Sequence, residues 1–366
     1  MRLYFIAGER SGDLHGGNLI KALRRFHPEV QLRGFGGDRM QAEGMELVAH
    51  YNQMAFMGVI QVVLNLRKIA GWMRTCKADI LNWKPDAVVL IDYGGFNMRL
   101  AAFLKEKNIR TVYYISPKVW AWNTGRALKL KATVDQMLCI LPFEKAFFKK
   151  FDWDVTYVGN PVMDAVRAFK PAESFRHRHG LGSQHVVALL PGSRRIELKR
   201  MLPLMAEVVR RFPQHLFVVA AIRELPESLY GPLMALPNVR FVYDETYELL
   251  LQARAAIVTS GTATLETGLF RVPQVVVYKA TALEYAIGSR IIKVDYISLV
   301  NLIAEAPVVR ELLQNEASVE NVTSELQQLL QEGEYRARML DGYQRVWDRL
   351  DIGSASENAA QAILRK

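Results

Sequence analysis

The sequence has very little cysteine and no long apolar run. Cys76 and Cys139 are the only cysteines among 366 residues. Two thiols cannot form a disulfide framework or a cysteine-based zinc site, so we expect a reducing, cytoplasmic environment. No stretch of about 18 uninterrupted apolar residues occurs, so no transmembrane helix is expected. The opening residues MRLYFIAG also lack the apolar span and cleavage site of a signal peptide.

Internal repeats and low-complexity tracts are absent as well. Half of the residues are hydrophobic and 23% are charged, which is typical of a globular protein. The length suits two domains rather than one. The formal net charge of +10 favours anionic partners: nucleic acid, acidic lipid headgroups or phosphorylated substrates. The basic residues are scattered and form no basic tail, so we expect no nucleic-acid partner.

Apolar runs alternate with helical patterns along the first 160 residues. The helical stretches are NLIKALRRF and RLAAFLKEK, and the strand-like runs are LYFIA, VQLRGFGG, AVVLIDYGG and TVYYIS. Runs that are apolar at successive positions are typical of parallel strands covered on both faces. This rhythm predicts a doubly wound α/β domain.

The same rhythm begins again after a polar, proline-bearing stretch at about 160–184. New strand-like runs follow, among them HVVALLPGS, HLFVVAAI, AAIVTSG and PQVVVYK. We therefore predict two facing Rossmann-like domains, residues 1–165 and 166–340. Residues 341–366 are helical by pattern, and we expect them to pack back across the boundary.

Two strand ends in the second half have the composition of phosphate-binding turns. In LLPGSRRIEL, Ser193 and Arg194 open a helical run; backbone N–H groups there bind anions, and an arginine adds a bidentate contact. In TSGTATLE, Ser260, Gly261 and Thr262 allow close backbone approach to a phosphate. Ordinary turns capped by serine or threonine are the alternative reading of both segments.

Glu266 lies about one turn into the helix that TSGTATLE opens. A carboxylate at this place can accept hydrogen bonds from both hydroxyls of a ribose. A helix-capping role for Glu266 is the alternative, although its spacing from Thr262 is one residue too long for a standard capping box.

Asp92 ends a wholly apolar strand in VVLIDYGGFN. Desolvation should raise the pKa of its carboxyl group, which suits a general base that takes a proton from a hydroxyl. A cap on the following helix is the alternative. At the first strand end, the turn GERSGD places Glu9 and Asp13 where a nucleotide-binding turn would hold phosphate, and its glycines do not form G-x-G-x-x-G.

Residues 54–77, MAFMGVIQVVLNLRKIAGWMRTCK, combine many aliphatic residues with basic ones. A basic apolar helix can lie in a membrane interface, whereas a buried core helix is the simpler interpretation of the same pattern. The membrane or acyl-chain contacts expected under the first interpretation are Met57, Val59, Ile60, Val62, Val63, Arg67 and Lys68.

An ordered set of motifs resembles the lipid-A-disaccharide synthase family, a group of inverting, two-domain B-type glycosyltransferases. The motifs are AGERSGDLHGGNLIKAL, GFGGDRMQAEGMEL, MGVIQVV, SPKVWAW, LPFEKAFF, LLPGSR, SGTATLE and KVDYISLVNLIA. The resemblance implies transfer of 2,3-diacylglucosamine from its UDP derivative to 2,3-diacylglucosamine 1-phosphate (lipid X), giving a β-1,6-linked disaccharide 1-phosphate and UDP. It also implies that no metal or other cofactor takes part.

The resemblance further implies a division of roles between the domains. The C-terminal domain would hold UDP through the two phosphate-type turns, Glu266 and the polar turn at Asn301. The N-terminal domain would hold the acceptor, with Asp92 as base, Glu9 as the reserve candidate, and Ser11 and Asn97 as acceptor contacts. Asp13 is predicted to cap the helix that follows it.

Family members are peripheral proteins on the cytoplasmic face of the Gram-negative inner membrane, and a dimer with exchanged C-terminal segments occurs among them. One departure stands out. The family commonly has I-D-x-P-D-F-N, whereas this chain has IDYGGFN, so Gly95 replaces the second acid. This puts in doubt any mechanism that relies on that acid.

Two other functions remain open at this stage. A related sugar-nucleotide enzyme, such as a UDP-N-acetylglucosamine 2-epimerase, needs no lipid-binding surface. A non-catalytic module that binds anions or nucleic acid would release no UDP, and its binding would weaken steeply with salt.

Overall fold

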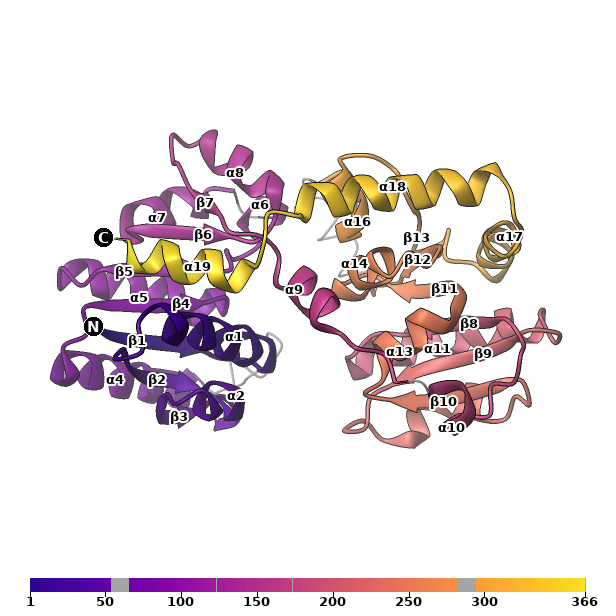
Figure 1. Cartoon of the computed structure of the whole chain (residues 1–366), viewed down its shortest axis with the longest axis horizontal. Helices are drawn as coiled ribbons and strands as arrows, with labels where there is room; N and C mark the ends of the chain where they lie inside the picture. Colours follow the sequence, from indigo (N-terminus) through magenta and orange to yellow (C-terminus); the bar gives the residue numbers. More distant parts are fainter. Residues whose placement is uncertain (54–65, 123, 173, 282–293, 366) are drawn as a thin grey trace. The chain divides into compact units, whose positions relative to one another are not determined.

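The chain forms two compact units, each with its own parallel sheet (Figure 1). The computed structural model describes residues 1–53, 66–122, 124–172, 174–281 and 294–365. One unit consists of Met1–Asp164 with Ile352–Lys366, and the other of Ala165–Asp351. The predicted class of two Rossmann-like α/β domains is confirmed.

The first unit contains a seven-stranded sheet with the order β3-β2-β1-β4-β5-β6-β7. The strands are β1 (Arg2–Ala7), β2 (Gln31–Gly36), β3 (Glu46–His50), β4 (Ala87–Ile91), β5 (Thr111–Tyr114), β6 (Gln136–Cys139) and β7 (Thr156–Tyr157). Its helices are α1 (Arg10–Phe26), α2 (Asp38–Ala42), a 3-10 turn (Tyr51–Gln53), α4 (Leu66–Trp83), α5 (Gly94–Glu106), α6 (Val119–Trp122), α7 (Arg126–Thr133), α8 (Pro142–Lys149) and α19 (Ala355–Leu364); α9 (Pro161–Ala168) runs across the boundary.

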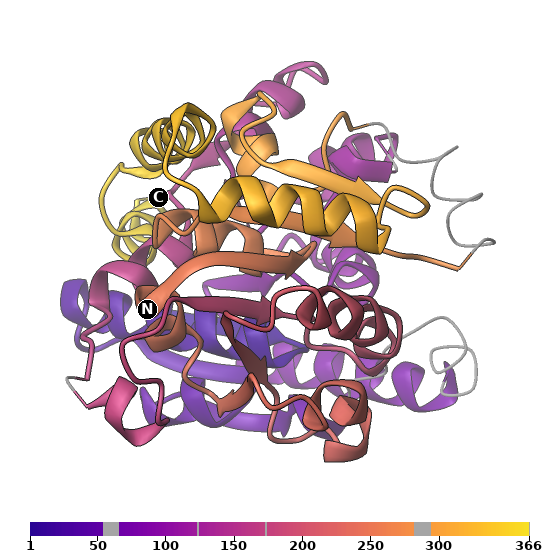
Figure 2. The same cartoon turned by 90° about the vertical axis from the view of Figure 1, so that its right-hand side faces the viewer.

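The second unit contains a six-stranded sheet with the order β10-β9-β8-β11-β12-β13, with helices on both faces (Figure 2). The strands are β8 (Val186–Leu190), β9 (Leu216–Ala221), β10 (Val239–Tyr243), β11 (Ala253–Thr259), β12 (Gln274–Tyr278) and β13 (Arg310–Leu313). Its helices are α10 (Phe175–Arg178), α11 (Arg195–Arg210), a 3-10 turn (Glu227–Tyr230), α12 (Gly231–Met234), α13 (Thr246–Gln252), α14 (Thr262–Leu269), α16 (Leu299–Ala304), α17 (Val319–Leu330) and α18 (Glu334–Leu350).

The first sheet is buried on both faces, as its apolar strands require. Tyr4 and Ile6 of β1 belong to one core cluster, together with side chains of α4 and α5. Leu3 and Phe5 belong to a second cluster, together with side chains of α1 and α19. Alternate residues of one strand therefore enter two separate cores, which explains why the run has no polar positions.

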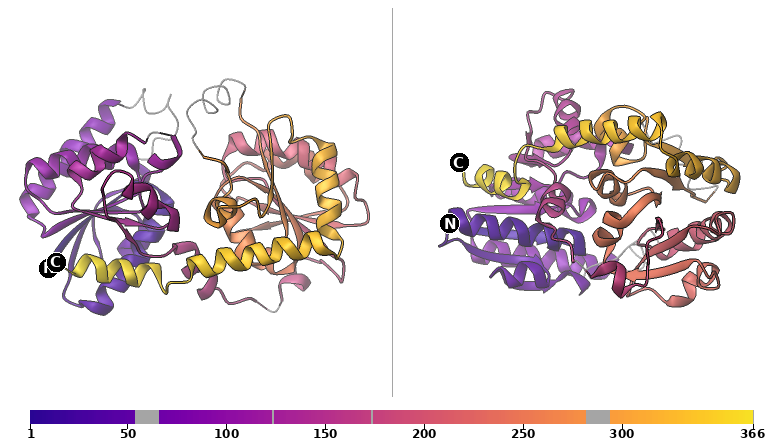
Figure 3. Two further views of the ribbon diagram at one scale, coloured as in Figure 1. Left: turned by 90° about the horizontal axis from the view of Figure 1, so that it is seen from above. Right: turned by 45° about the vertical axis from the view of Figure 1, so that its right-hand side comes forward.

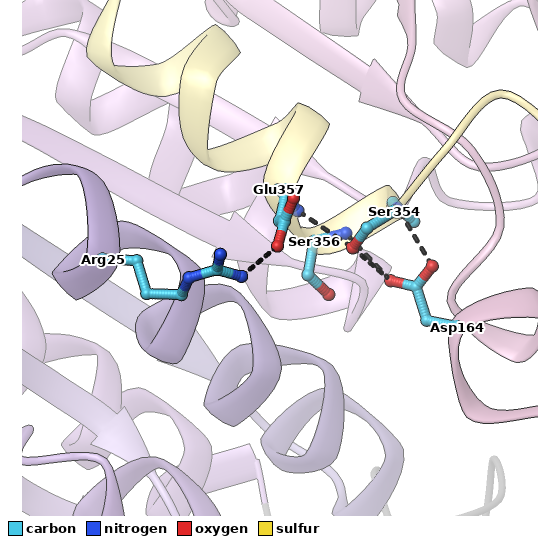
Figure 4. Close-up of polar contacts among 6 residues, drawn as sticks. Arg25, Asp164, Ser354, Ser356 and Glu357 are labelled. Atoms are coloured by element: carbon cyan, nitrogen blue, oxygen red, sulfur yellow. Dashed lines mark hydrogen bonds and ion pairs between the residues drawn. The ribbon is translucent and has the colours of Figure 1, made fainter. Parts of the chain in front are cut away.

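The last helix, α19, is part of the first unit although it follows the whole of the second (Figure 3). Asp164, at the end of the first segment of the unit, caps its N-terminus. The Asp164 carboxylate accepts hydrogen bonds from the Ser354 hydroxyl at 3.1 Å and from the backbone N–H groups of Ala355 and Ser356 at 3.0 and 3.1 Å (Figure 4). On α1, Arg25 forms an ion pair with Glu357 (Figure 4).

The break between the last two helices lies later than the sequence pattern predicted. The predicted boundary at residue 341 falls inside α18, which is continuous as far as Leu350 and belongs to the second unit. Tyr343, Val346 and Leu350 are buried and continue its apolar face. The helix ends at Leu350, and the short link to α19 turns at Gly353, whose φ of 93° lies in the left-handed region that favours glycine.

Candidate active site

A pocket of about 450 Å³ opens at the point in the first sheet where the strand order reverses, between β1 and β4. Open α/β sheets bind ligands beyond the carboxyl ends of strands at such a point. Ala7 and Ile91, the last residues of these strands, are paired, so the turns after them lie side by side. The described residues lining the pocket are Glu9, Ile69, Ala70, Met73, Asp92, Tyr93, Gly94, Gly95, Phe96 and Arg99.

The structure thus brings together Glu9 and Asp92, the two acids predicted for the reaction. They share the pocket with an apolar wall, to which α4 contributes Ile69 and Met73 and α5 contributes Phe96. A pocket that joins two carboxylates to an apolar wall fits a ligand with hydroxyl groups and hydrocarbon in the same molecule.

Asp92 lies in a backbone turn that few residues adopt. Asp92 and Tyr93 have φ values of 43° and 47°, the left-handed region that is costly for residues other than glycine. The Asp92 carbonyl oxygen accepts hydrogen bonds from the Asn97 side-chain amide at 2.9 Å and from the Tyr113 hydroxyl at 2.6 Å. These two buried donors hold the turn that presents the Asp92 carboxyl group to the pocket.

The Asp92 carboxyl group has the acidity expected of a general base. Its pKa is raised to about 6, chiefly by burial and also by the negative charge of Glu9, while the positive charge of Lys118 and a hydrogen bond from the Tyr93 backbone act in the opposite direction. A base with a pKa near the working pH is largely ionised and still able to hold a proton. The helix-cap alternative is not supported, because Tyr93 occupies the N-cap position of α5 and no side chain caps that end.

Ser11 and Asn97 were both predicted to contact the acceptor, and their positions differ from that of Asp92. Ser11 is exposed in the first turn of α1 and is not among the residues that line the pocket. Asn97 is fully buried, and its amide donates to the carbonyl groups of Ile91 and Asp92. Asn97 thus positions the Asp92 turn, and its predicted contact with the acceptor remains a prediction.

Asp13 caps a helix, but not the helix that was predicted. Its carboxylate is buried and accepts hydrogen bonds from the backbone N–H groups of Gly37, Arg39 and Met40, at 2.7 to 3.1 Å. Those groups lie at the start of α2, whereas the prediction placed Asp13 as the cap of α1. Asp13 thus joins α1 to the start of α2. It is not among the described residues that line the pocket.

Gly95 leaves open space in the first turn of α5, the helix that follows Asp92. A Cβ atom added at Gly95 would meet nothing within 4 Å, whereas one at Gly94 would touch Pro117 at 3.2 Å. Gly95 itself lines the pocket, and Asp92 and Glu9 are the acids among the described residues that line it.

The two phosphate-type turns of the second unit also lie on neighbouring strands. Leu190 of β8 pairs with Val258 of β11, where the strand order of the second sheet reverses. Ser193 and Arg194 follow β8 and are exposed, and their backbone N–H groups donate to the Glu197 carboxylate at 3.0 and 3.1 Å. An acid of the chain thus occupies these anion-binding amides in the structure.

The second turn follows β11 and leads into α14. Gly261 and Thr262 are exposed, and the Ser260 hydroxyl donates to the Ile297 carbonyl at 3.1 Å. Backbone groups at this turn remain accessible to an anion. Both turns therefore have the placement that the sequence predicted for a diphosphate site, and the roles of their residues remain predictions.

Glu266 is held at a single oxygen. The Tyr247 hydroxyl donates to its Oε1 at 2.8 Å, and burial raises the pKa of the Glu266 carboxyl group. Among the described residues, no hydrogen bond to the other carboxylate oxygen of Glu266, Oε2, is found. This oxygen can accept a hydrogen bond from a ligand hydroxyl.

Glu266→Gln is therefore expected to weaken UDP binding by roughly tenfold, because an amide is a poorer acceptor for two ribose hydroxyls. Calorimetric titration with UDP measures this, with Glu248→Gln as a carboxylate control in the neighbouring helix α13. Unchanged affinity in Glu266→Gln would identify Glu266 as a purely structural partner of Tyr247.

Asn301 was predicted to contact the donor; in the structure its side chain forms hydrogen bonds within the protein, and the donor contact remains a prediction. Its side chain is buried, donates to the Val309 carbonyl and the Glu311 carboxylate, and accepts from the Val309 backbone N–H, all at 2.8 to 2.9 Å. Asn301 therefore ties α16 to β13. Val309 and Glu311, only eight and ten residues further along the chain, supply these partners.

The predicted membrane contacts are only partly described. Met57, Val59, Ile60, Val62 and Val63 lie outside the described residues. Arg67 and Lys68 are exposed at the start of α4. No described helix is both long and apolar enough to span a bilayer, and the described residues contain no group of three or more His, Cys, Asp or Glu side chains suited to a metal ion.

Solved structures with the same architecture include UDP-GlcNAc 2-epimerases and glycosyltransferases. The UDP-GlcNAc 2-epimerase from Neisseria meningitidis, bound to UDP-GlcNAc, matches with a TM-score of 0.72 at 14% identity, over all of both chains. The kitacinnamycin glycotransferase matches with a TM-score of 0.69 at 14% identity, over 99% of this chain and 98% of its own. At such low identity these likenesses establish the fold, that of two-domain B-type glycosyltransferases and their relatives.

Sequence comparison identifies the family. The profile of the Lipid-A-disaccharide synthetase family matches residues 3–364. The lipid-A-disaccharide synthase of Syntrophus aciditrophicus is 38% identical over 98% of this chain and 96% of its own length. That of Geobacter sulfurreducens is 35% identical over 99% and 96%. The chain belongs to the lipid-A-disaccharide synthetase family.

Proposed function

We propose that the protein transfers 2,3-diacylglucosamine from UDP-2,3-diacylglucosamine to the 6-hydroxyl of 2,3-diacylglucosamine 1-phosphate. The products are the β-1,6-linked disaccharide 1-phosphate and UDP. Family membership supports this reaction, and the observation that carries it is the pocket in which Asp92, with its raised pKa, meets the apolar wall of α4. A diacylated sugar needs both the base and the wall.

In the proposed mechanism Asp92 accepts the proton of the acceptor 6-hydroxyl as its oxygen attacks the anomeric carbon of the donor. The bond from that carbon to the UDP oxygen breaks on the opposite face, so the configuration inverts. Backbone amides at the turns of Ser193 and Ser260, together with Arg194, stabilise the charge that develops on the leaving diphosphate. Neither a metal ion nor another cofactor is part of the proposal.

The decisive experiment incubates the purified protein with both lipid substrates and analyses the product by mass spectrometry. We expect a tetraacyl disaccharide 1-phosphate and one UDP for each disaccharide. A reaction unchanged by EDTA supports the metal-free route. Consumption of the UDP sugar without a disaccharide would contradict the proposal.

The likeness to solved 2-epimerases makes epimerisation of a UDP sugar the second candidate. An epimerase acting on UDP-N-acetylglucosamine has no use for the apolar wall of α4. Incubation with UDP-N-acetylglucosamine alone, followed by separation of the 2-epimers, tests this candidate, and we expect no second epimer.

The position of the positive charge supports a membrane-associated place of action. Residues 66–151, from α4 to just beyond α8, contain 16 Lys and Arg against 6 Asp and Glu, whereas the rest of the chain contains 31 of each. The whole formal charge of +10 thus arises in this part of the first unit. We infer peripheral binding to the cytoplasmic face of a Gram-negative inner membrane, where both lipid substrates are available. Homodimer formation is a further part of the proposal, which light scattering after gel filtration tests.

Charge reversal of Arg67, Lys68 and Arg74, all exposed on α4, is expected to release the protein from anionic vesicles. Each basic residue near such a surface contributes about 1 kcal/mol, so losing three weakens binding at least about a hundredfold. Co-sedimentation with phosphatidylglycerol vesicles at low salt measures the effect.

The matched control reverses Lys170, Arg240 and Arg345, three exposed residues of the second unit. It changes the net charge equally and should leave vesicle binding nearly unchanged. Equal losses in both triple variants would show that overall charge matters and the location on α4 does not. Wild-type protein that stays in solution would remove the membrane from the proposal.

A further inference from the structure

Arg99 is a cation in a pocket otherwise lined by acidic, aromatic and small or apolar residues. It lies on α5 and lines the pocket with Glu9 and Asp92. Among the described lining residues it carries the one positive charge. Its side chain is also exposed, so a ligand entering the pocket can reach it without displacing a core contact.

The placement of Arg99 along α5 separates it from the two acids. Arg99 is five positions after Gly94, the first residue of the helix, which corresponds to a rise of about 7.5 Å along the helix axis. Asp92 lies just before that first residue. This separation is comparable to the length of a hexose from its 6-hydroxyl to a group on its anomeric carbon.

The charged side chains make the two ends of the pocket different for a ligand. A phosphate near Asp92 and Glu9 would be repelled by both carboxylates, whereas a hydroxyl there can donate a hydrogen bond to either one. At the other end, a guanidinium group matches the geometry of phosphate and forms two parallel hydrogen bonds to it. A sugar with a hydroxyl at one end and a phosphate at the other therefore fits in one orientation.

We propose that Arg99 binds the phosphate on the anomeric carbon of the acceptor and thereby directs the acceptor 6-hydroxyl to Asp92. Arg99 is then a specificity-determining residue that makes the phosphorylated lipid the preferred acceptor. This inference rests on the proposed function, since it names the group by which the same pocket recognises its substrate.

The test compares two acceptors in neutral detergent micelles: 2,3-diacylglucosamine 1-phosphate and the same lipid without the phosphate. We expect wild-type protein to prefer the phosphorylated acceptor in kcat/KM by roughly ten- to a hundredfold, as for a charge-assisted contact. Arg99→Ala should remove this preference, mainly through a higher KM for the phosphorylated acceptor, and leave the other acceptor unchanged. Arg99→Lys should restore part of it.

Lys107→Ala is the matched control, because it removes an exposed cation at the other end of α5; it should keep the wild-type preference. A preference that persists in Arg99→Ala would assign the phosphate to other groups, such as the backbone N–H groups of Gly94 and Gly95, and overturn the inference. Equal losses with both acceptors would also overturn it, since they indicate a general structural role.

Two further outcomes separate the possible causes. If wild-type protein forms no disaccharide from either acceptor, the proposed function fails before Arg99 is tested. If Arg99→Ala changes the rate only when phosphatidylglycerol is added to the micelles, the anion bound by Arg99 is a lipid headgroup of the membrane, and the acceptor assignment is wrong.

Discussion

Asp92→Asn is expected to reduce sugar transfer by about 10²- to 10⁴-fold, the usual effect of removing a general base, while UDP binding stays nearly unchanged. Asparagine keeps the shape of the side chain but cannot take the proton of the acceptor hydroxyl. Gly95 places no second carboxylate beside it. Single-turnover assays with both lipids measure the rate, and calorimetry measures the affinity for UDP.

The pH dependence of the same reaction gives a second view of Asp92. Its pKa is raised to about 6, and the base must be ionised to accept a proton. The value of kcat/KM for the acceptor should therefore fall as the pH drops below about 6. Because the charge of Glu9 helps to raise this pKa, Glu9→Gln should move the acidic limb to lower pH.

If Asp92→Asn retains more than about a tenth of the wild-type rate, a loss far below the range for a general base, Asp92 is not the base. Glu9 is then the next acid to test, because it lines the same pocket. Glu106→Gln, which alters an exposed acid at the end of α5, is the control and should leave the rate and its pH profile unchanged.

Arg194→Ala is expected to lower kcat/KM for the UDP-sugar donor by about 2–4 kcal/mol of transition-state stabilisation, since a charge-assisted and bidentate contact to the diphosphate is lost. The Arg194 side chain is 68% exposed, with its guanidinium 3.6 Å from the Glu197 carboxylate. The guanidinium group is therefore available to a ligand, and truncating the side chain removes few contacts within the protein.

Arg195→Ala is the natural comparison, because Arg195 is the next residue and is also exposed. It should alter donor use by less than about tenfold, as expected for an exposed charge that contacts no ligand. Rates are measured at limiting donor and saturating acceptor. Near-normal turnover in Arg194→Ala under these conditions would exclude Arg194 from the donor site.

The elements and the two main acids of the candidate site could be predicted from local pattern. Continuous apolar strands indicated parallel sheets, and the rule for strand ends placed Glu9 and Asp92 at one edge. The left-handed turn at Asp92 could not be predicted from the neighbouring residues. Asn97 and Tyr113 donate the hydrogen bonds that hold it, and Tyr113 lies on β5, which is brought next to the turn only when the sheet forms.

Polar side chains were the least predictable part of the site. Asn97 and Asn301 are residues of a type that often contacts ligands. In the structure both side chains are buried and form hydrogen bonds with backbone groups. Asp13 caps a helix more than twenty residues away. A short polar side chain serves whichever unpaired backbone group the fold brings near it, and that choice depends on tertiary structure. Arg99 was missed because nothing in its local sequence distinguishes it from other helical arginines.

The capping of α19 by Asp164 has a consequence for how the protein is made. The ribosome completes residues 165–351, an entire second domain, before the helix that finishes the first one emerges. Until then Leu19, Ile20 and Leu23 on α1 lack the cover of Ala359, Ala360 and Ile363, so a nascent chain exposes an apolar surface for as long as the second domain takes to synthesise. The N-terminal domain is therefore the later of the two to reach its final state, although it is the first to be translated.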